Sequence, residues 1–374
     1  MRILRIDSRS PYRALVGVGG IGSGCFFALE GNHTLGRNES RPGRSLNVRD
    51  YCKLHIIIHY VAKLLGAGCG EHDFRVLPIG LVGDDAAGRQ VVEEMAAAGI
   101  DTSQVRTLAD KPTLFSVCFQ YPDGSGGNIT TSNSAAALLR EAHVDAAATL
   151  LGSGGRQVMA LAAPEVPLGV RRYFLELATR AGAFRLASFV SAEIGDAEQC
   201  GMFGLLDLVS LNESEAAELV GETFSPEKAE GFLQKCQQFL RSSSPNLRMV
   251  VSAGAEGAYA VTREMWDYRP APQVQAVSTA GAGDALLGGI IAAMAAGAPL
   301  LRAPEPGHAL PGAELETALD LGVLLASYKC QSPHTIHPDA RLRALIDFAR
   351  SRDLRFAPGL ESRFSQNSSP EPIV

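Results

Sequence analysis

Paired cysteines, an excess of basic residues and long apolar runs are all scarce in this sequence. The chain of 374 residues holds seven cysteines, which are scattered and form no C-x-x-C pair. Their number is odd, and a chain of this length can build a core without a disulfide framework. We therefore expect reduced thiols and a cytoplasmic location.

Positive charge does not predominate. Lysine and arginine together number 34 against 40 acidic residues, which gives a formal net charge of −6. This balance excludes a bulk basic surface for nucleic acid or for an anionic membrane. A local basic groove for a small nucleotide remains open.

No segment predicts a membrane span or a signal peptide. Residues 285–301 carry no charge, but the stretch falls short of the roughly 20 residues that a spanning helix needs. It also contains two adjacent glycines and Pro299. The first 13 residues are polar and lack an apolar core, which is unlike a signal peptide. We expect residues 285–301 to form a buried helix.

The sequence does contain a regular alternation of strand-like and helix-like segments. Such alternation predicts a parallel sheet covered by helices on both faces. A β-rich hairpin over residues 113–132 interrupts it, and it must either cover a site or pair with another subunit. A homodimer through this hairpin is therefore plausible, and the polar residues 358–374 predict a disordered tail. The expected strands are 14–19, 75–81, 157–162, 185–190, 206–211, 248–252, 258–262 and 274–277; the expected helices are 47–65, 86–98, 168–181, 214–220, 315–330 and 340–351.

Four small residues and an acid precede the uncharged helix. The amide groups at a helix N-terminus have no partners within the helix and carry partial positive charge, so they suit a phosphate. Asp284, in the first turn, could take a proton from a hydroxyl that attacks a phosphoryl group. The alternative is a buried helix with an ordinary acidic N-terminus. The four small residues are Ala280, Gly281, Ala282 and Gly283.

Two other loops follow predicted strands, and ligands bind at the carboxyl ends of strands in such sheets. Asn212 and Glu215 are three residues apart, so an amide and a carboxylate could hold Mg²⁺ through water. They could equally form a helix capping box. Gly254 and Gly257 could approach a nucleotide or could simply make a turn. The three loops together favour a phosphate site.

Residues 17–22 match the G-x-G-x-x-G pattern of dinucleotide-binding proteins. That pattern needs a continuous helix directly after it. Here residues 25–30 allow fewer than two turns before Gly31, so a dehydrogenase is the weaker alternative.

The motifs resemble those of the ribokinase-like (PfkB) carbohydrate kinase family. The segment 278–284 is similar to its D-T-x-G-A-G-D signature, with Ser278 replacing the first acid. Asn212-x-x-Glu215 resembles its N-x-x-E motif, and Ser252-x-Gly254-x-x-Gly257 resembles its nucleotide loop. The likeness extends over roughly residues 14–350, and the C-terminal motifs are the more specific ones.

The resemblance implies a ribokinase-like three-layer α/β/α sandwich with a mostly parallel central sheet and a small β lid. A single kinase domain would cover residues 1–357, with the lid from about 25–45 and 113–132. The implied activity is ATP- and Mg²⁺-dependent phosphorylation of a hydroxymethyl group on a sugar, a sugar-like molecule or a nucleoside. The implied roles are general base for Asp284, anion hole for residues 280–283, metal binding through water for Glu215, and nucleotide binding for Asn212, Ser252, Gly254, Gly257 and Thr279.

The sequence departs from the family pattern at the substrate end. Gly24 stands where the family places an aspartate that binds substrate hydroxyls. The family's Gly-Gly-x-x-x-Asn is matched only by residues 42–47, with one glycine lost. Gly24, Gly43 and Asn47 are therefore the expected substrate contacts. The missing acid leaves open a binding or regulatory protein of the same fold that has lost catalysis.

Overall fold

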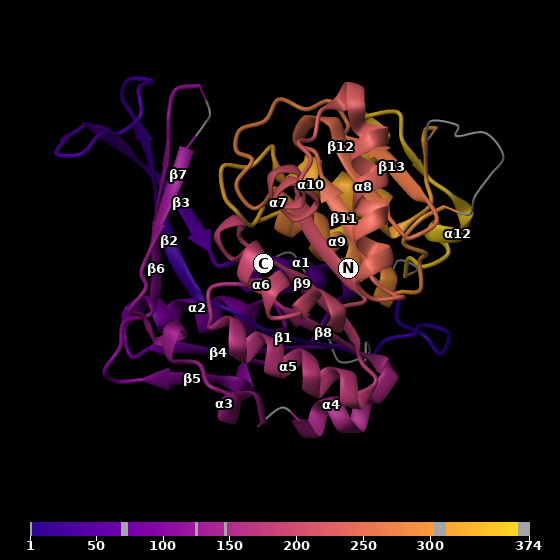
Figure 1. The fold of residues 1–374 in the computed structure, drawn as a ribbon, viewed down its shortest axis with the longest axis horizontal. Helices are drawn as coiled ribbons and strands as arrows, with labels where there is room; N and C mark the ends of the chain where they lie inside the picture. Colours follow the sequence, from indigo (N-terminus) through magenta and orange to yellow (C-terminus); the bar gives the residue numbers. More distant parts are fainter. Residues whose placement is uncertain (1, 69–73, 124–125, 146–147, 303–311, 366–374) are drawn as a thin grey trace, which may run out of the picture.

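A nine-stranded sheet forms the centre of the molecule (Figure 1). The computed structural model describes residues 2–68, 74–123, 126–145, 148–302 and 312–365. The strand order is β13-β12-β11-β10-β9-β8-β1-β4-β5, and β12 alone runs in the opposite direction to the other strands. The predicted, mostly parallel sheet is thus confirmed. Its strands are β1 (Ala14–Val18), β4 (Arg75–Gly83), β5 (Val105–Leu108), β8 (Val158–Ala162), β9 (Phe184–Ser188), β10 (Leu208–Asn212), β11 (Arg248–Ser252), β12 (Gly257–Val261) and β13 (Trp266–Pro270).

Apolar side chains of the strands alternate between two layers, one on each face of the sheet. In β1, Leu15 belongs to one layer and Val16 to the other, and Met159 and Ala160 of β8 divide in the same way. Consecutive strand residues point to opposite faces, so both faces need a cover of helices. The three-layer α/β/α sandwich is confirmed. One layer contains α1 (Lys53–Leu65), α2 (Ala86–Ala97), α9 (Ala282–Ala295), α10 (Ala318–Lys329) and α11 (Leu342–Ser351); the other contains α3 (Glu141–Asp145), α4 (Ala148–Gly154), α5 (Leu168–Ala181), α6 (Ile194–Gln199), α7 (Glu213–Val220) and α8 (Ala229–Ser242).

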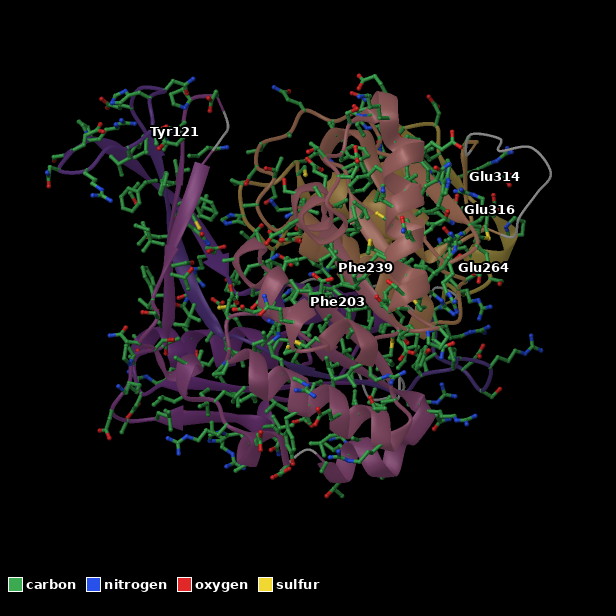
Figure 2. All side chains as sticks on the ribbon, in the orientation of Figure 1. Tyr121, Phe203, Phe239, Glu264, Glu314 and Glu316 are labelled. Carbon is green, nitrogen blue, oxygen red and sulfur yellow. The ribbon has the colours of Figure 1, made fainter. Side chains whose placement is uncertain are left out.

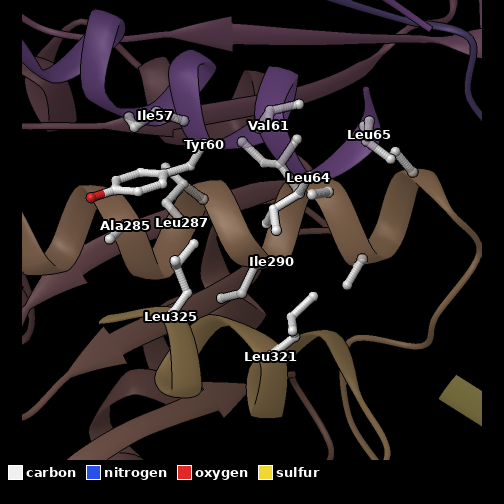
Figure 3. Packing of buried hydrophobic residues seen from close by; sticks show 14 of the residues in the cluster. Ile57, Tyr60, Val61, Leu64, Leu65, Ala285, Leu287, Ile290, Leu321 and Leu325 are labelled. Atoms are coloured by element: carbon white, nitrogen blue, oxygen red, sulfur yellow. The ribbon is translucent and has the colours of Figure 1, made fainter. Parts of the chain in front are cut away.

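Helix α9 lies between α1 and α10 in the first layer. Figure 3 shows side chains of the three helices interleaving, among them Tyr60, Ile290 and Leu321. The helices approach closely because facing positions are glycine: a Cβ on Gly289 would lie 2.9 Å from the Cα of Gly322. An apolar helix of this kind belongs in a core. Within the described residues, no helix is long and apolar enough to cross a bilayer.

A separate four-stranded sheet, which we call the lid, stands beside the sandwich (Figure 1). Tyr121, labelled in Figure 2, lies near the outer end of the lid. Its hydroxyl accepts a hydrogen bond from the Leu35 amide, and the Arg41 guanidinium lies 5.8 Å from the centre of its ring. The lid also exposes Phe115 and Ile129, which suits the dimer that the hairpin predicts. The dimer itself stays a prediction. The lid strands, in spatial order, are β3 (Gly43–Tyr51), β2 (Gly22–Leu29), β6 (Leu114–Gln120) and β7 (Gly126–Thr130).

The helix expected over residues 47–65 is wrong in its first part. Residues up to Tyr51 belong to β3, and α1 begins only at Lys53 after Cys52. The reason is pairing with β2, which brings Asp50 opposite Gly24. The same strand β2 follows β1 directly, so the glycines at 17–22 lead into the lid and not into the helix that a dinucleotide site requires.

The strand expected over residues 274–277 is also absent. That segment joins no sheet, and the chain bends at Val277; the Val277 amide donates to the Cys330 carbonyl, and the Val277 side chain is 55% exposed. The sheet edge is already occupied by β13. The anion-binding stretch therefore follows an irregular loop and not a strand end.

The C-terminal segment is ordered further than composition predicted. Helix α12 (Pro358–Glu361) packs with Leu360 buried, and Phe364 pairs with Leu4 near the other end of the chain. Just before this helix, β14 (Glu314–Leu315) pairs with β15 (Arg355–Phe356). The apolar residues within the predicted tail account for the difference. The rest of it, residues 366–374, lies outside the described residues.

Candidate active site

Residues 278–283, which we call the anion loop, lead into α9. Gly281 is the N-cap residue with φ +77°, and a Cβ there would lie 2.8 Å from the Thr335 carbonyl oxygen. Only glycine fits that backbone and that space. The Ala280 and Ala282 amides donate within the loop, whereas the Gly281 and Gly283 amides have no acceptor among the described residues. These two amides are available to an anion.

Asp284 is the third residue of α9 and is 9% exposed. Burial raises the pKa of its carboxyl group to about 6, although the positive charges of Lys53 and Lys329 oppose the shift. The negative charges of Glu215 and Asp50 add to it. A carboxylate with such a pKa can accept a proton near neutral pH.

Asp284 opens on a cavity of about 310 Å³, the acidic cavity, which Asp50, Lys53 and Glu165 also line. Asp50 accepts hydrogen bonds from the Ser116 hydroxyl, at 2.5 Å, and from the Cys118 thiol, at 3.2 Å. Carboxylates in a cavity of this size suit a small ligand with several hydroxyl groups, because each hydroxyl can donate to one of them.

Glu165 and Lys53 are in contact at the wall of this cavity. Glu165 follows β8 with φ +72°, which is unusual for a residue with a side chain. Burial raises the pKa of its carboxyl group to about 7, against the Cys52 hydrogen bond and the charge of Lys53. The Lys53 amide donates to the Glu165 carboxylate at 3.3 Å, and its ammonium donates to the Phe189 carbonyl at 3.1 Å. Burial opposes the charge of Lys53, but Asp284 and the neighbouring glutamates raise its pKa.

A second cavity of about 570 Å³, the larger cavity, lies on the other side of the anion loop. Its walls come from the carboxyl ends of β10 and β11, the start of β12, and the apolar faces of α9 and α10. Gly257 has φ +114°, and a Cβ there would collide with the Arg269 carbonyl. The sequence-predicted nucleotide residues Asn212, Ser252, Gly254, Gly257 and Thr279 all line this cavity.

Thr279 lines both cavities. Ala282 and Gly283 face the larger one, and Ala280 and Gly281 face the acidic one. The anion loop is thus the wall between two ligand-sized spaces. An anionic group bound at its amides would be reachable from both sides.

Asn212 and Glu215 form the capping box that was the alternative interpretation. The Glu215 amide donates to the Asn212 side chain at 2.8 Å, and the Asn212 amide donates to the Glu215 carboxylate at 2.9 Å. Asn212 lines the larger cavity but Glu215 does not. Burial raises the pKa of Glu215, while the charge of Lys53 lowers it, so this carboxylate lies within electrostatic reach of the site. Among the described residues, no group of three or more His, Cys, Asp or Glu side chains could hold a metal by itself.

The three residues expected to bind substrate lie elsewhere. Gly43 and Asn47 are exposed on β3, and neither lines the acidic cavity. Gly24 packs beneath Asp50 and Ser116, and a Cβ on Gly24 would collide with the Ser116 hydroxyl. Position 24 carries no acid, but a carboxylate, Asp50, faces it across the lid strands.

Lys329 was not expected from the sequence. It is fully buried at the end of α10, and its ammonium donates to the Ser278 carbonyl at 2.9 Å. Burial lowers its pKa to about 8, against the negative charge of Asp284. It lies on a helix that the sequence marks only as apolar, so no local signal separates it from a surface lysine. Its hydrogen bond to Ser278 holds the first residue of the anion loop in place.

The chain is similar to known kinases over much of its length. The family model described as "pfkB family carbohydrate kinase" matches residues 59–341. A ribokinase from Haemophilus influenzae is 24% identical over 220 residues, which cover 59% of this chain and 68% of that protein.

Solved structures of similar fold include the ribokinase of Cryptococcus neoformans in complex with ADP. It has a TM-score of 0.70 and 20% identity, over 90% of this chain and 99% of that one. The Burkholderia thailandensis nucleoside kinase in complex with inosine has a TM-score of 0.64 and 17% identity, over 90% and 98%. Likenesses at this identity support the ribokinase-like fold, and the family match covers most of the chain. The protein belongs to the pfkB family of carbohydrate kinases.

Proposed function

We propose that this kinase transfers the terminal phosphoryl group of ATP to a hydroxymethyl group of a sugar or sugar-like small molecule. One observation supports this most: the anion loop separates a nucleotide-sized cavity from an acidic cavity that contains Asp284. ATP would occupy the larger cavity and the acceptor the acidic one. The Cryptococcus ribokinase, which shares the fold, was solved in complex with ADP, and this is consistent with a nucleotide as the phosphoryl donor.

The reaction uses Asp284 as the general base. Its carboxylate takes the proton of the acceptor hydroxyl while the hydroxyl oxygen attacks the terminal phosphorus. The bond from that phosphorus to the bridging oxygen breaks, and ADP leaves with the electron pair. The Gly281 and Gly283 amides stabilise negative charge on the transferring group. Lys53, whose charge interacts with Asp284, adds positive charge on the acceptor side.

Mg²⁺ would be held through water by Glu215, whose carboxylate oxygens are the ligands that this ion prefers. The ion neutralises phosphate charge when it is bound with ATP. The part played by Glu215 itself is to remain ionised: the positive charge of Lys53 and the Asn212 amide both favour its carboxylate form.

The acidic cavity favours a polyhydroxylated acceptor. Asp50, Glu165 and Asp284 supply carboxylates that accept hydrogen bonds, and Asp50 is fixed by Ser116 and Cys118. The lid strands that carry Asp50 would exclude water, which competes for the phosphoryl group. A nucleoside is the second candidate, because a nucleoside kinase that binds inosine shares the fold.

The experiment is a panel of sugars, polyols and nucleosides screened for ADP release. We expect turnover with at least one sugar or polyol, and Asp284→Asn should lower kcat by about 10²–10⁴-fold while ADP still binds. Turnover with nucleosides alone would favour the second candidate. No turnover on any compound, with ADP binding intact, would favour a protein that has lost catalysis.

A further inference from the structure

The end of β3 that carries Asp50 is held by the rest of the lid on one side only. β3 is an edge strand, and its partner in the lid is β2. The register between the two strands shifts between Cys25 and Phe26, and on the near side of this shift only residues 49–51 are paired. A shift of this kind disrupts the ladder locally. The short segment 49–51 therefore depends on contacts from outside the lid to stay in place.

Helix α2, at the foot of the lid (Figure 1), supplies such contacts through Glu94. One carboxylate oxygen of Glu94 forms an ion pair with Arg49, and the other accepts a hydrogen bond from the Tyr51 hydroxyl at 2.8 Å. The Gln90 side-chain amide also donates to the first oxygen, at 3.1 Å. A further contact, from the Thr335 hydroxyl to the Arg49 carbonyl at 3.3 Å, holds only the backbone. One carboxylate thus fixes two of the three residues at the end of β3.

Arg49 and Tyr51 flank Asp50 in the sequence, and this determines where the Asp50 side chain points. Consecutive residues of a strand face opposite sides of the sheet. While the Arg49 guanidinium and the Tyr51 hydroxyl are held by α2, the Asp50 carboxylate is directed into the acidic cavity. There Ser116 and Cys118 donate to one of its oxygens. The contacts of Glu94 and the orientation of Asp50 are therefore coupled through the strand.

We propose that Glu94 is a positioning residue for the phosphoryl acceptor: it holds the end of β3 so that the Asp50 carboxylate stays in the acidic cavity and orients an acceptor hydroxyl. Glu94 acts through β3, since it does not itself line that cavity. The effect on the acceptor rests on the proposed function. The effect on Asp50 does not, and it can be measured without any acceptor.

The Cys118 thiol reports the position of Asp50. It donates to that carboxylate at 3.2 Å, and burial, followed by the negative charge of Asp50, raises its pKa to about 12. If Asp50 moves away, part of this effect is lost, and alkylation becomes faster because the thiolate is the form that reacts. The measurement is the rate at which iodoacetamide labels each cysteine of the whole chain at constant pH, followed by peptide mass spectrometry.

Glu94→Ala should accelerate the labelling of Cys118 by about three- to tenfold, as expected for a fall of roughly half a unit to one unit in the pKa of the thiol. Cys200, half-buried at the end of α6, is an internal control and should react at an unchanged rate. Glu93→Ala, at an exposed glutamate of the same helix, should change neither rate. In an Asp50→Asn background, adding Glu94→Ala should change the labelling of Cys118 by less than about twofold, because two changes that act through one contact are not additive.

Kinetics with the acceptor that the panel identifies separate positioning from general support of the fold. Glu94→Ala should raise the KM of the acceptor about tenfold, the size expected when a charged hydrogen-bonding group is misplaced, and should change kcat and the Kd of ADP by less than about twofold. Tyr51→Phe removes one of the two side-chain contacts, so its effect should be intermediate. Glu93→Ala should leave all three constants unchanged.

An unchanged labelling rate of Cys118 in Glu94→Ala would overturn the proposal. Equal acceleration at Cys118 and Cys200, or the same acceleration in the Asp50→Asn background, would show a general loosening of the fold and would also overturn it. Faster labelling with an unchanged KM would mean that Asp50 does not orient the acceptor, which contradicts the proposed role of Glu94. A panel without turnover would count against the proposed function alone, because the labelling of Cys118 still decides whether Glu94 holds Asp50.

Discussion

The charge state of Asp284 depends on its burial, and with Asp284 as the proposed general base it should set the pH range in which the enzyme works. Burial raises the pKa of this carboxyl group to about 6. A general base must be unprotonated, so kcat/KM should be constant above about pH 7 and fall tenfold per unit well below pH 6. The pH–rate profile checks this.

Glu165→Gln is the matched control, because burial raises the pKa of Glu165 to about 7. We expect that variant to bind the acceptor more weakly but to keep an acid limb near pH 6. An acid limb near pH 4, the ordinary range for an aspartate, would contradict the assignment of Asp284.

Substitution of Lys329 should affect both the stability of the anion loop and the pKa of Asp284, and the two effects can be measured separately. Lys329→Met removes a buried ammonium and leaves the Ser278 carbonyl without its donor, which should cost about 1–3 kcal/mol of stability. The charge of Lys329 also lowers the pKa of Asp284. The acid limb of the pH–rate profile should therefore move to higher pH. Lys235→Met, an exposed lysine on α8, should change neither melting temperature nor profile.

Residue identities alone predicted half of the site. Asp284 and the residues that we propose bind the nucleotide follow from local motifs, which are contiguous in sequence and keep their geometry in any fold that contains them. Asp50, Lys53 and Glu165 belong to no such motif; they meet only because β3, α1 and the end of β8 converge. Asp50 could have been found had residues 43–51 been assigned to a strand, since pairing with β2 places it opposite Gly24.

Two nearby glycines at the start of α9 should respond in opposite ways to substitution by alanine. Gly281→Ala forces a side chain into a left-handed backbone, 2.8 Å from the Thr335 carbonyl oxygen. Gly283 has no atom within 4 Å of its added Cβ. We expect Gly281→Ala to lower the melting temperature and weaken ADP binding at least tenfold. Gly283→Ala should leave the melting temperature unchanged or raise it, since alanine favours a helix.

Thermal melting and ADP titration of both variants measure this. Equal destabilisation of the two would mean that neither glycine of the anion loop tolerates a side chain, and that the left-handed conformation of Gly281 has no special importance.

Most elements were predictable because the spacing of their apolar residues matches the buried side of the element. A helix buries one face, and a central strand of the sheet buries both. The failures share a cause. Residues 47–51 and 274–277 both have strand-like or helix-like patterns, but what they become depends on a distant partner: β2 for the first and the occupied sheet edge for the second. Local sequence does not encode whether such a partner is free.

The molecule as a whole should respond to its nucleotide. ADP that binds only the folded state at about 100 times its Kd would add about 2.7 kcal/mol of stability, which should raise the melting temperature by several degrees. NAD⁺ at equal concentration should have no effect, because β1 leads into the lid and not into a helix that could hold a dinucleotide. Stabilisation by NAD⁺ without stabilisation by ADP would contradict the assignment of the larger cavity.

The shared wall at Thr279 has a consequence for inhibitor design. A single compound that carries an adenosine group at one end and a polyol at the other could occupy both cavities, with a phosphate-like linker along the anion loop. Once one end is bound, the other end is confined near its own cavity at a high effective concentration. Selectivity among related kinases would then come from the polyol end, where Asp50 and Glu165 line the wall and position 24 carries no acid.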